Sequence, residues 1–435
     1  MSAPDKAVII GGSIAGLLAA RVLRDIAAEV VIIEPDALPD VPINRAGIAH
    51  GDQFHVLLGL GQDLLTHWFP TLLDDLVTDG AVLCEAETDG RMFVDGTARP
   101  PVRDRFLAFH RPTLEWRLRR AVLPGVRLVR DRVLGLDIHA DRVTGVALAA
   151  GTTEPADLVI DATGRASRLG EWLSQSDYPL PRKRRIALDL GYATALYHRT
   201  PDQRLDGLLA VHSLRSPTSD TPGVSCWAAL GHDRWICTIS GYGPDRPSRD
   251  QGEFTARCLR EPAAGFEELV RTCTPVGPVA THRFPHSVRR DFHTVERFPA
   301  GVVPLGDAVA SFNPIYGQGV PSAALHASAL AAWLRSGEDV HGYFRRLKVL
   351  VDAAWQTSVI ADYSLPHLAN RRPRGHRLRQ AVSNAIDRAA MTDPLVARRF
   401  ADVINMRAHP TELLRTDILG RTLRDTLTRA KSLVG

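Results

Sequence analysis

The chain has 435 residues, 45% of them hydrophobic, which is enough for two or three domains around a large buried core. Its 53 Lys and Arg residues exceed the 49 Asp and Glu residues by too little to indicate a nucleic-acid-binding protein, and its five cysteines include no Cys-x-x-Cys pair that would suggest a disulfide framework or a zinc site. Because no apolar run reaches the roughly 18 residues of a membrane-spanning helix and the first residues lack a signal-peptide pattern, we expect a soluble cytoplasmic protein without a bound metal.

The first predicted unit is a strand, a tight turn, a helix and a second strand. Residues 6–10 form a short apolar run, a helical pattern continues to about Asp25, and residues 30–33 form a second apolar run. This order is typical of the first βαβ unit of a parallel sheet. The turn matches a dinucleotide fingerprint with a serine at the middle glycine position, and its residues are Gly11, Gly12, Ser13, Ile14, Ala15 and Gly16.

The positions of this turn have distinct physical roles. Gly11 permits the tight turn, Gly16 lets helix and strand pack closely, and the amides at the helix N-terminus can face a pyrophosphate. Glu34 closes the second strand, where it is placed to accept a hydrogen bond from a ribose hydroxyl. A glycine-rich turn without a ligand is the alternative, which this acidic residue makes less favoured.

The rest of the chain predicts two further kinds of structure. Residues 156–161 and 301–305 have the character of buried strands, whereas residues 224–230 and 234–240 alternate and predict a β-hairpin around Gly231, His232 and Asp233. From about residue 341 the chain is rich in Ala, Leu and Arg, with prolines between predicted helices. We therefore expect an α/β fold, α+β overall, with a Rossmann-like dinucleotide-binding domain (1–172 and 285–340), a mostly antiparallel β-sheet substrate domain (173–284) and a C-terminal helical region (341–435).

A second cluster follows the strand at 301–305 and reads Gly-Asp-Ala-Val-Ala-Ser-Phe-Asn-Pro-Ile-Tyr-Gly-Gln-Gly-Val-Pro over residues 306–321. Here the chain resembles the aromatic-hydroxylase superfamily of FAD-dependent monooxygenases, the para-hydroxybenzoate hydroxylase-like enzymes. The resemblance implies that Asp307 binds the ribityl chain and that residues 314–319, which we call the flavin loop, pass under the isoalloxazine ring. It also implies that the next helix directs its N-terminal amides at the flavin, which is negatively charged when reduced. The resemblance implies that Pro314, Gly317 and Gln318 are the candidates nearest the catalytic chemistry, and that Gly319 and Val320 also bind the cofactor.

Two other segments extend the resemblance. Arg111 matches an arginine that contacts FAD in the family, although a surface arginine at a helix start is an equal alternative. Gly164 lies in a further cofactor-binding segment, but Thr163 stands where the family usually has an aspartate associated with FAD and NAD(P)H. The electron donor is therefore NADPH or a separate flavin reductase, and the threonine favours the reductase.

Within the superfamily, the chain is most similar to the flavin epoxidases of polyether antibiotic biosynthesis, over most of residues 6–330. The similarity rests on the loop at 44–57, which contains the cofactor-binding candidate Arg45, on the Thr163 region, and on Phe-Asn-Pro-x-Tyr-Gly at 312–317. It implies a monooxygenase of secondary metabolism that epoxidises or hydroxylates a hydrophobic polyene or polyketide-type substrate through a flavin C4a-hydroperoxide. The cofactor performs the oxygen chemistry in such enzymes, so no catalytic triad is required.

Two other functional classes stay open. A cyclase of Diels-Alder type, which binds FAD without using it for redox chemistry, is compatible with Thr163. A flavin-dependent halogenase is less favoured because the Trp-x-Trp-x-Ile-Pro signature of that family is missing. The candidate substrate contacts are aromatic residues of the antiparallel sheet, Tyr192, Trp227 and Trp235, with burial in the core as the alternative.

The C-terminal region carries most of the positive charge. Residues 371–431 contain 14 basic and 6 acidic side chains. This excess is either an ordinary solvated helical surface or a docking surface for an acidic carrier protein or an anionic membrane, which long-range attraction would recruit.

Overall fold

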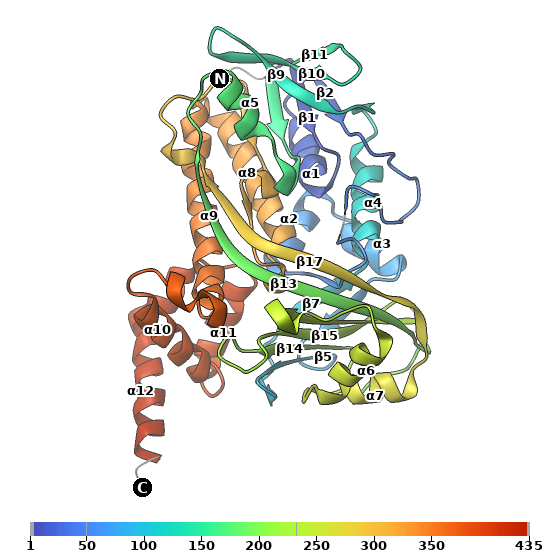
Figure 1. Ribbon diagram of the computed structural model, residues 1–435, viewed down its shortest axis with the longest axis vertical. Coiled ribbons are helices and arrows are strands. Elements are labelled where there is room, and N and C mark those ends of the chain that lie inside the picture. Colours follow the sequence, from blue (N-terminus) through green and yellow to red (C-terminus); the bar gives the residue numbers. More distant parts are fainter. Residues whose placement is uncertain (1–3, 49, 232, 433–435) are drawn as a thin grey trace.

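The computed structural model describes residues 4–48, 50–231 and 233–432, and a five-stranded parallel sheet forms one end of it (Figure 1). Its strands, in spatial order, are β18 (Val302–Pro304), β12 (Leu158–Asp161), β1 (Lys6–Ile10), β2 (Glu29–Ile33) and β8 (Arg127–Val129). Helices α1 (Ile14–Leu23) and α8 (Gly319–Ser336) lie beside this sheet. The middle strand β1 is almost wholly buried, as expected for a parallel strand covered on both faces.

An eight-stranded sheet forms the opposite end of the molecule. Its strands, in spatial order, are β19 (Ala310–Ser311), β17 (Pro275–Asp291), β13 (Arg182–His198), β16 (Arg234–Tyr242), β15 (Gly223–Leu230), β14 (Ala210–Arg215), β5 (Gly90–Val94) and β6 (Thr97–Ala98). Its pairs are antiparallel except for β14 with β5. Strands β13 and β17 are long enough to reach from this sheet to the other end of the molecule (Figure 1).

One face of the eight-stranded sheet is covered by α6 (Gln251–Arg260) and α7 (Phe266–Thr272). The side chains between these helices and the sheet form a separate hydrophobic core that includes Trp227, Trp235, Phe254 and Phe266. Since side chains of a strand alternate between the two faces, the remaining residues of β15 and β16 face the other way, toward the middle of the molecule.

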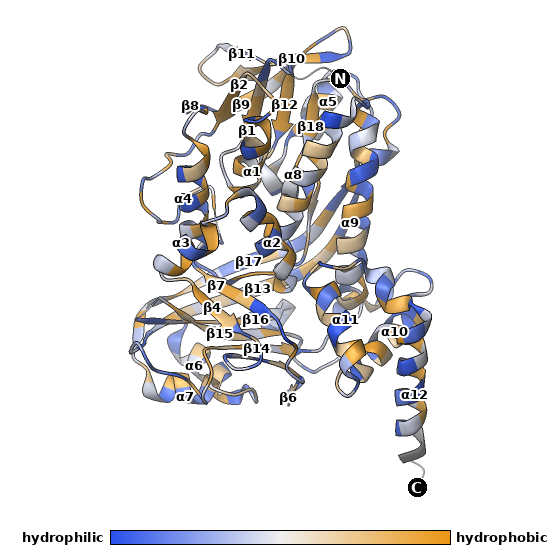
Figure 2. Ribbon diagram, turned by 180° about the vertical axis from the view of Figure 1, so that it is seen from behind, coloured by the Kyte–Doolittle hydropathy of each residue, from blue (hydrophilic) through white to orange (hydrophobic). Residues whose placement is uncertain are grey.

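Of the C-terminal helices, the first lies beside α8, the next two lie near the eight-stranded sheet, and the last extends away from the body (Figure 2). They are α9 (Val340–Asp362), α10 (His376–Ala389), α11 (Pro394–Ile404) and α12 (Thr416–Ser432). The start of α11 shows why helices form here, because the Asp393 side chain accepts from the amides of Leu395 and Val396 while Pro394 takes the first helical position. In the described part of the chain, no helix combines the length and the apolar character that a bilayer span needs.

Smaller elements complete the fold. Two three-stranded sheets are formed by β11 (Thr153–Pro155), β10 (Arg142–Leu148) and β9 (Val133–His139), and by β3 (His55–Leu57), β7 (Arg105–Phe109) and β4 (Val82–Glu85). The remaining α-helices are α2 (Gly59–Trp68), α3 (Leu72–Thr78), α4 (Arg111–Val122) and α5 (Leu169–Gln175).

The α/β fold class and the predicted strands are confirmed, including the hairpin of β15 and β16; His232 of its turn lies outside the described residues. The eight-stranded sheet differs from the expected substrate domain in two respects. It includes β5 and β6, which come from the first 172 residues, and β17 runs through the expected boundary at residue 284. Because β17 belongs to one sheet along its whole length, residue 284 does not coincide with the end of a structural element.

Candidate functional site

The turn after β1 has a backbone that requires glycine at two positions. Gly11 has a φ of +103°, and a Cβ atom on it would lie 2.8 Å from the carbonyl oxygen of Ala162. A Cβ atom on Gly16 would lie 1.9 Å from the carbonyl oxygen of Gly11. The hydroxyl of Ser13 donates to Glu115 Oε2 at 3.0 Å instead of capping α1. The first amides of α1 therefore lack a side-chain cap among the described residues, which leaves them available to an anion.

Glu34 and Arg45 form the wall beside this turn. Glu34 Oε2 accepts the N–H of Gly12 at 2.8 Å, and its Oε1 accepts the N–H of Asp36 at 3.0 Å. Arg45 Nη1 lies 3.3 Å from Glu34 Oε2 and 3.1 Å from Asp36 Oδ2. Its Nη2 is buried without a hydrogen-bond partner in the part of the chain that the structure describes. A buried guanidinium donor of this kind suits a ligand that brings an oxygen acceptor.

Glu115 is a member of this site that the sequence reasoning did not identify. It is 2% exposed, and its carboxylate pairs with Arg45 Nε at 2.8 Å, with Arg111 at 3.2 Å and with Arg119 at 3.4 Å. Arg111 also donates to Ser13 Oγ at 3.1 Å, so the serine of the fingerprint belongs to the same network. The detectable signal was the Arg, Glu and Arg spacing at 111, 115 and 119 on one predicted helix, because residues four apart meet on a helix surface.

Asp307 follows β18 and lies across the cavity from α4. Burial raises the pKa of its carboxyl group, while a hydrogen bond from Ser311 and the guanidinium groups of Arg165 and Arg111 oppose that shift. The carboxylate therefore has cationic neighbours and a single hydroxyl donor, which leaves acceptor capacity for the hydroxyl groups of a ligand.

Thr163 takes part in a turn that follows β12. Its hydroxyl and that of Ser167 both donate to Asp161, a carboxylate that is fully buried at the strand end. The threonine side chain is thus committed to holding the turn, and the cavity at this point is lined by Thr163 and Gly164, with Asp307 as the neighbouring carboxylate.

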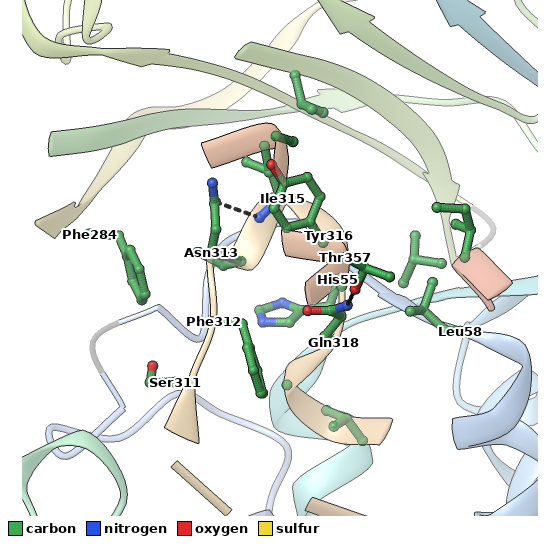
Figure 3. A pocket seen from close by; sticks show the side chains of 18 of the residues that line it. His55, Leu58, Phe284, Ser311, Phe312, Asn313, Ile315, Tyr316, Gln318 and Thr357 are labelled. Atoms are coloured by element: carbon green, nitrogen blue, oxygen red, sulfur yellow. Dashed lines mark hydrogen bonds between the residues drawn. The ribbon is translucent and has the colours of Figure 1, made fainter. Parts of the chain in front are cut away.

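The flavin loop is fixed in place by α9. Gln318 donates through Nε2 to Thr357 Oγ1 at 2.9 Å and accepts from Ser358 Oγ at 2.7 Å. Gly317 has a φ of +67°, a left-handed conformation that favours glycine. Figure 3 shows the side chains gathered here, which include those of His55, Phe284, Phe312, Asn313, Tyr316, Gln318 and Thr357.

A single cavity of about 1980 Å³ joins these features. The predicted cofactor positions on its wall are Gly11, Ser13, Ile14, Ala15, Glu34, Arg45, Arg111, Gly164, Asp307, Pro314, Gly317, Gly319 and Val320, with Gln318 beside them. Gly12 and Gly16 are not on the wall; the first donates to Glu34 and the second lets α1 approach β1.

The residues at one end of the cavity fit FAD. An uncapped helix N-terminus and the Arg45 donor suit a pyrophosphate, Glu34 is an acceptor at the end of the second strand, and Asp307 is an acceptor between that end and the flavin loop. Gly11 provides the close backbone approach that a side chain would block. The donor set therefore matches a dinucleotide with a flavin at its far end.

Histidines form part of the wall near the flavin loop. The His50 ring lies 5.7 Å from both His55 and His282, and the His282 ring stacks on Tyr192 at 6.4 Å. Burial lowers the pKa of His55 to about 3 and also lowers that of His50. These rings are consequently neutral at pH 7, and they can hydrogen-bond a substrate without adding charge.

The three predicted substrate contacts separate in the structure. Tyr192 lines the cavity, but Trp227 and Trp235 do not. Both tryptophans are fully buried against α6 and α7 and contact each other edge to face at 5.4 Å. The expectation that they contact substrate is corrected by strand alternation, because the neighbouring residues Cys226 and Ile236 occupy the opposite face.

No protein-family model matches the chain. The chain is 33% identical over 454 aligned residues to Protein Rv3254 of Mycobacterium tuberculosis, an alignment that covers 97% of the chain and 94% of the relative. It is 26% identical to a kynurenine 3-monooxygenase of Salinispora arenicola, covering 97% of the chain and 91% of that protein. In the solved flavin-dependent brominase Bmp2, the same fold superposes with a TM-score of 0.64 at 14% identity, over 98% of the chain and 99% of that structure. The chain therefore belongs to the family of Protein Rv3254, within the aromatic-hydroxylase superfamily of FAD-dependent oxidoreductases.

Proposed function

We propose that this protein is an FAD-dependent monooxygenase that epoxidises or hydroxylates a hydrophobic polyene or polyketide-type substrate in secondary metabolism. The observation that carries the proposal is the continuity of the cavity, which runs from the dinucleotide turn past the flavin loop to one face of the eight-stranded sheet. A cofactor at the first end and an apolar substrate on the sheet would share one continuous cavity, so that the substrate could reach the flavin.

The chain's own residues have binding and positioning roles in this proposal. Asp307, Glu34 and Arg45 hold the two ends of FAD, and Gln318 holds the flavin loop against α9. Bound FAD would supply the redox chemistry. The neutral histidines and Tyr192 form a wall on which an electron-rich alkene or arene could pack, with the guanidinium of Arg165 nearby.

The preference for a polyene or polyketide rests on the resemblance to the polyether-type epoxidases at residues 312–317. The sequence similarity to kynurenine 3-monooxygenase supports oxygenation as the reaction class. A non-redox cyclase is the second candidate, and the observation that favours it is the commitment of the Thr163 hydroxyl to Asp161. The likeness to the brominase is one of fold, and it supplies no argument for halogenation.

Purification provides the first test. We expect yellow protein from which denaturation releases FAD, because no covalent attachment motif accompanies the site. Asp307→Ala should lose most of the flavin, whereas Asp339→Asn, which keeps an acceptor at the start of α9, should retain it. Colourless wild-type protein that takes up no FAD on titration would refute the proposal. A flavoprotein that transforms its substrate equally with and without reductant and O2 would establish the cyclase instead.

The electron donor forms a separate part of the proposal. With Thr163 in place of an aspartate, we expect NADPH alone to reduce the flavin slowly and an added flavin reductase to accelerate turnover. Stopped-flow absorbance after mixing with NADPH measures this directly. Bleaching by NADPH at ordinary turnover rates, about 1 to 1000 per second, would show that a reductase is unnecessary.

A further inference from the structure

The cavity continues far beyond the flavin loop, along one row of side chains on the eight-stranded sheet. In the strand registers Thr238 is opposite Cys226, Cys226 opposite His212, and His212 opposite Met92. The N–H of Arg99 then donates to the carbonyl of Met92 at 2.7 Å, just beyond β6. Residues that are opposite one another share a face of the sheet, and all five line the cavity.

This row ends a long way from the substrate wall at Tyr192. Five inter-strand spacings separate β13, which carries Tyr192, from β6, and at about 4.8 Å per spacing they amount to about 24 Å. An occupant that reaches both ends must therefore be elongated.

The C-terminal helices supply the opposite wall of this extension. Leu378, Val382 and Ile386 are spaced four residues apart on α10, and Phe400 and Ile404 have the same spacing on α11. All five line the cavity, as expected for one apolar face on each helix. The extension is thus apolar along most of its length.

Two polar atoms at the far end have no partner. Arg99 Nε and His212 Nδ1 are buried and make no hydrogen bond to any described residue. The other side of the Arg99 guanidinium pairs with Asp387 of α10, and its carbon lies 4.8 Å from the centre of the Phe400 ring. A buried donor without an acceptor is costly to leave unsatisfied, so this end of the cavity is suited to an oxygen acceptor.

The charges at this end of the cavity favour a neutral oxygen over a carboxylate. Asp387 already pairs with Arg99, so this guanidinium is charge-compensated without a ligand, and a neutral oxygen can accept from its free Nε–H. Burial, together with the charge of Arg99, lowers the pKa of His212 to about 4. The ring is neutral at pH 7, where one nitrogen can donate and the other accept.

We propose that Arg99 and His212 form a distal subsite that binds a carbonyl or hydroxyl group of an elongated, otherwise apolar substrate. His212 is three inter-strand spacings from β13 and Arg99 is five, so the group bound between them lies about 14 to 24 Å across the sheet from Tyr192, and it sets which carbon of the distant part reaches the flavin loop. This inference rests on the proposed function and names its substrate class, a long apolar molecule with a neutral oxygen at one end.

The test uses the holoprotein and two probes with the same polyene skeleton, all-trans-retinol and all-trans-retinoic acid. Binding is measured by fluorescence titration without reductant. We expect retinol to bind and retinoic acid to bind more weakly. The double variant Arg99→Gln/Asp387→Asn removes the ion pair as a unit, and His212→Leu removes the second partner. Each should weaken retinol binding about tenfold, while Arg388→Gln, an exposed neighbour on α10, should not change it.

Two controls keep the outcome decisive. Unchanged FAD content and thermal midpoint show that a variant is folded. Because there are two independent variants, the test still works if one of them does not fold. The subsite would be overturned by equal retinol affinity in wild type and both folded variants, by tighter binding of retinoic acid than of retinol, or by no retinol binding. Binding is measured without reductant and so does not depend on turnover. A protein that binds retinol through Arg99 but oxygenates no substrate would therefore refute only the proposed function.

Discussion

Asp362, the last residue of α9, is a buried carboxyl group in contact with the flavin-loop region. Its Oδ1 accepts from Asn313 Nδ2 at 2.8 Å and from the Tyr316 hydroxyl at 3.1 Å. Asn313 Nδ2 also donates to the Tyr242 hydroxyl at 3.0 Å, and Asp362 Oδ2 has no partner among the described residues. Burial raises the pKa of Asp362 to about 7, against the two hydrogen bonds, which lower it.

This residue should make stability depend on pH in a defined direction. Between about pH 4 and pH 7 the unfolded chain has the carboxyl ionised whereas the folded protein keeps the proton. Folding then takes up a proton, so the group's contribution falls as pH rises, by about 1.4 kcal/mol per pH unit, and is constant above about pH 7. Asp362→Asn cannot ionise. Subtracting the unfolding free energies of the variant from those of wild type should therefore reveal this slope, and a difference independent of pH would contradict it.

Glu115 carries a second prediction at this scale, because one buried carboxylate serves three guanidinium groups. Glu115→Gln keeps the size and removes the charge, which should cost about 3 to 5 kcal/mol of stability and weaken FAD binding through Arg45 and Arg111. Urea unfolding with and without added FAD separates the two effects. Glu171→Gln, which breaks an exposed pair with Arg168, is the matched control and should leave both measurements unchanged.

The same residues show how far sequence reasoning reaches. The roles of Gly11 and Gly16 follow from local chain geometry, so the motif alone predicts them. Glu115, which is a partner of both Ser13 and Arg45, comes from α4, 102 and 70 residues away, and only the fold brings it to them. Asp362 belongs to no motif, and its raised pKa is a product of burial that no local pattern encodes.

At the scale of elements, the turn before α7 is tightly constrained by packing. Gly265 has a φ of +78°, and a Cβ atom on it would lie 2.2 Å from Cζ2 of the buried Trp227. Gly207 has a φ of +76° with nothing near its Cβ position. Gly207→Ala should therefore cost only the backbone strain, about 1 to 2 kcal/mol, and Gly265→Ala about 1 to 3 kcal/mol more from overpacking. Urea denaturation of both variants measures the difference. Equal losses of unfolding free energy would show that the Trp227 indole can move aside without cost.

Element prediction succeeded where one signal dominates. The β1, turn and α1 unit has a clear change of period, and the β15 and β16 hairpin has two short runs around a glycine turn. The run Val-Ser-Cys-Trp-Ala-Ala-Leu is apolar on both faces, however, so its sequence does not tell which face meets helices and which meets the cavity. The error over Trp227 and Trp235 follows from that ambiguity.

At the scale of the whole molecule, the cavity is a product of chain segments that are far apart in sequence. Its lining comes from the dinucleotide turn, β5, the hairpin strands, the flavin loop, α10 and α11. Recruitment of β5 and β6 to the far edge of the sheet extends that lining to Arg99. Such an edge depends on pairings between strands more than 100 residues apart, and the hydrophobic periodicity of the sequence does not predict these pairings.

The charge of the C-terminal region also has a different distribution in three dimensions from that in the sequence. Arg407 pairs with Asp63 and Asp104, and Arg372 donates to the backbone carbonyls of residues 363 and 364. Arg371, Arg374 and Arg377 are instead exposed, next to Leu378 and Arg379, which line the cavity. One part of the exposed positive charge therefore lies beside the cavity wall.

We propose that these three arginines dock an acidic carrier protein that presents the substrate to the cavity. The triple variant Arg371→Gln/Arg374→Gln/Arg377→Gln should leave FAD content unchanged and weaken binding of an acyl carrier protein. Raising salt from about 0.1 M to 1 M should weaken wild-type binding in the same way, because it shortens the screening length from about 10 Å to 3 Å. The triple variant Arg388→Gln/Arg398→Gln/Arg424→Gln makes the same charge change at exposed positions elsewhere in the region and should bind normally. Calorimetric titration measures each case. Equal losses of carrier affinity in both triple variants would show that only net charge matters. If the wild-type protein binds anionic vesicles but not the carrier, a membrane surface is the partner instead.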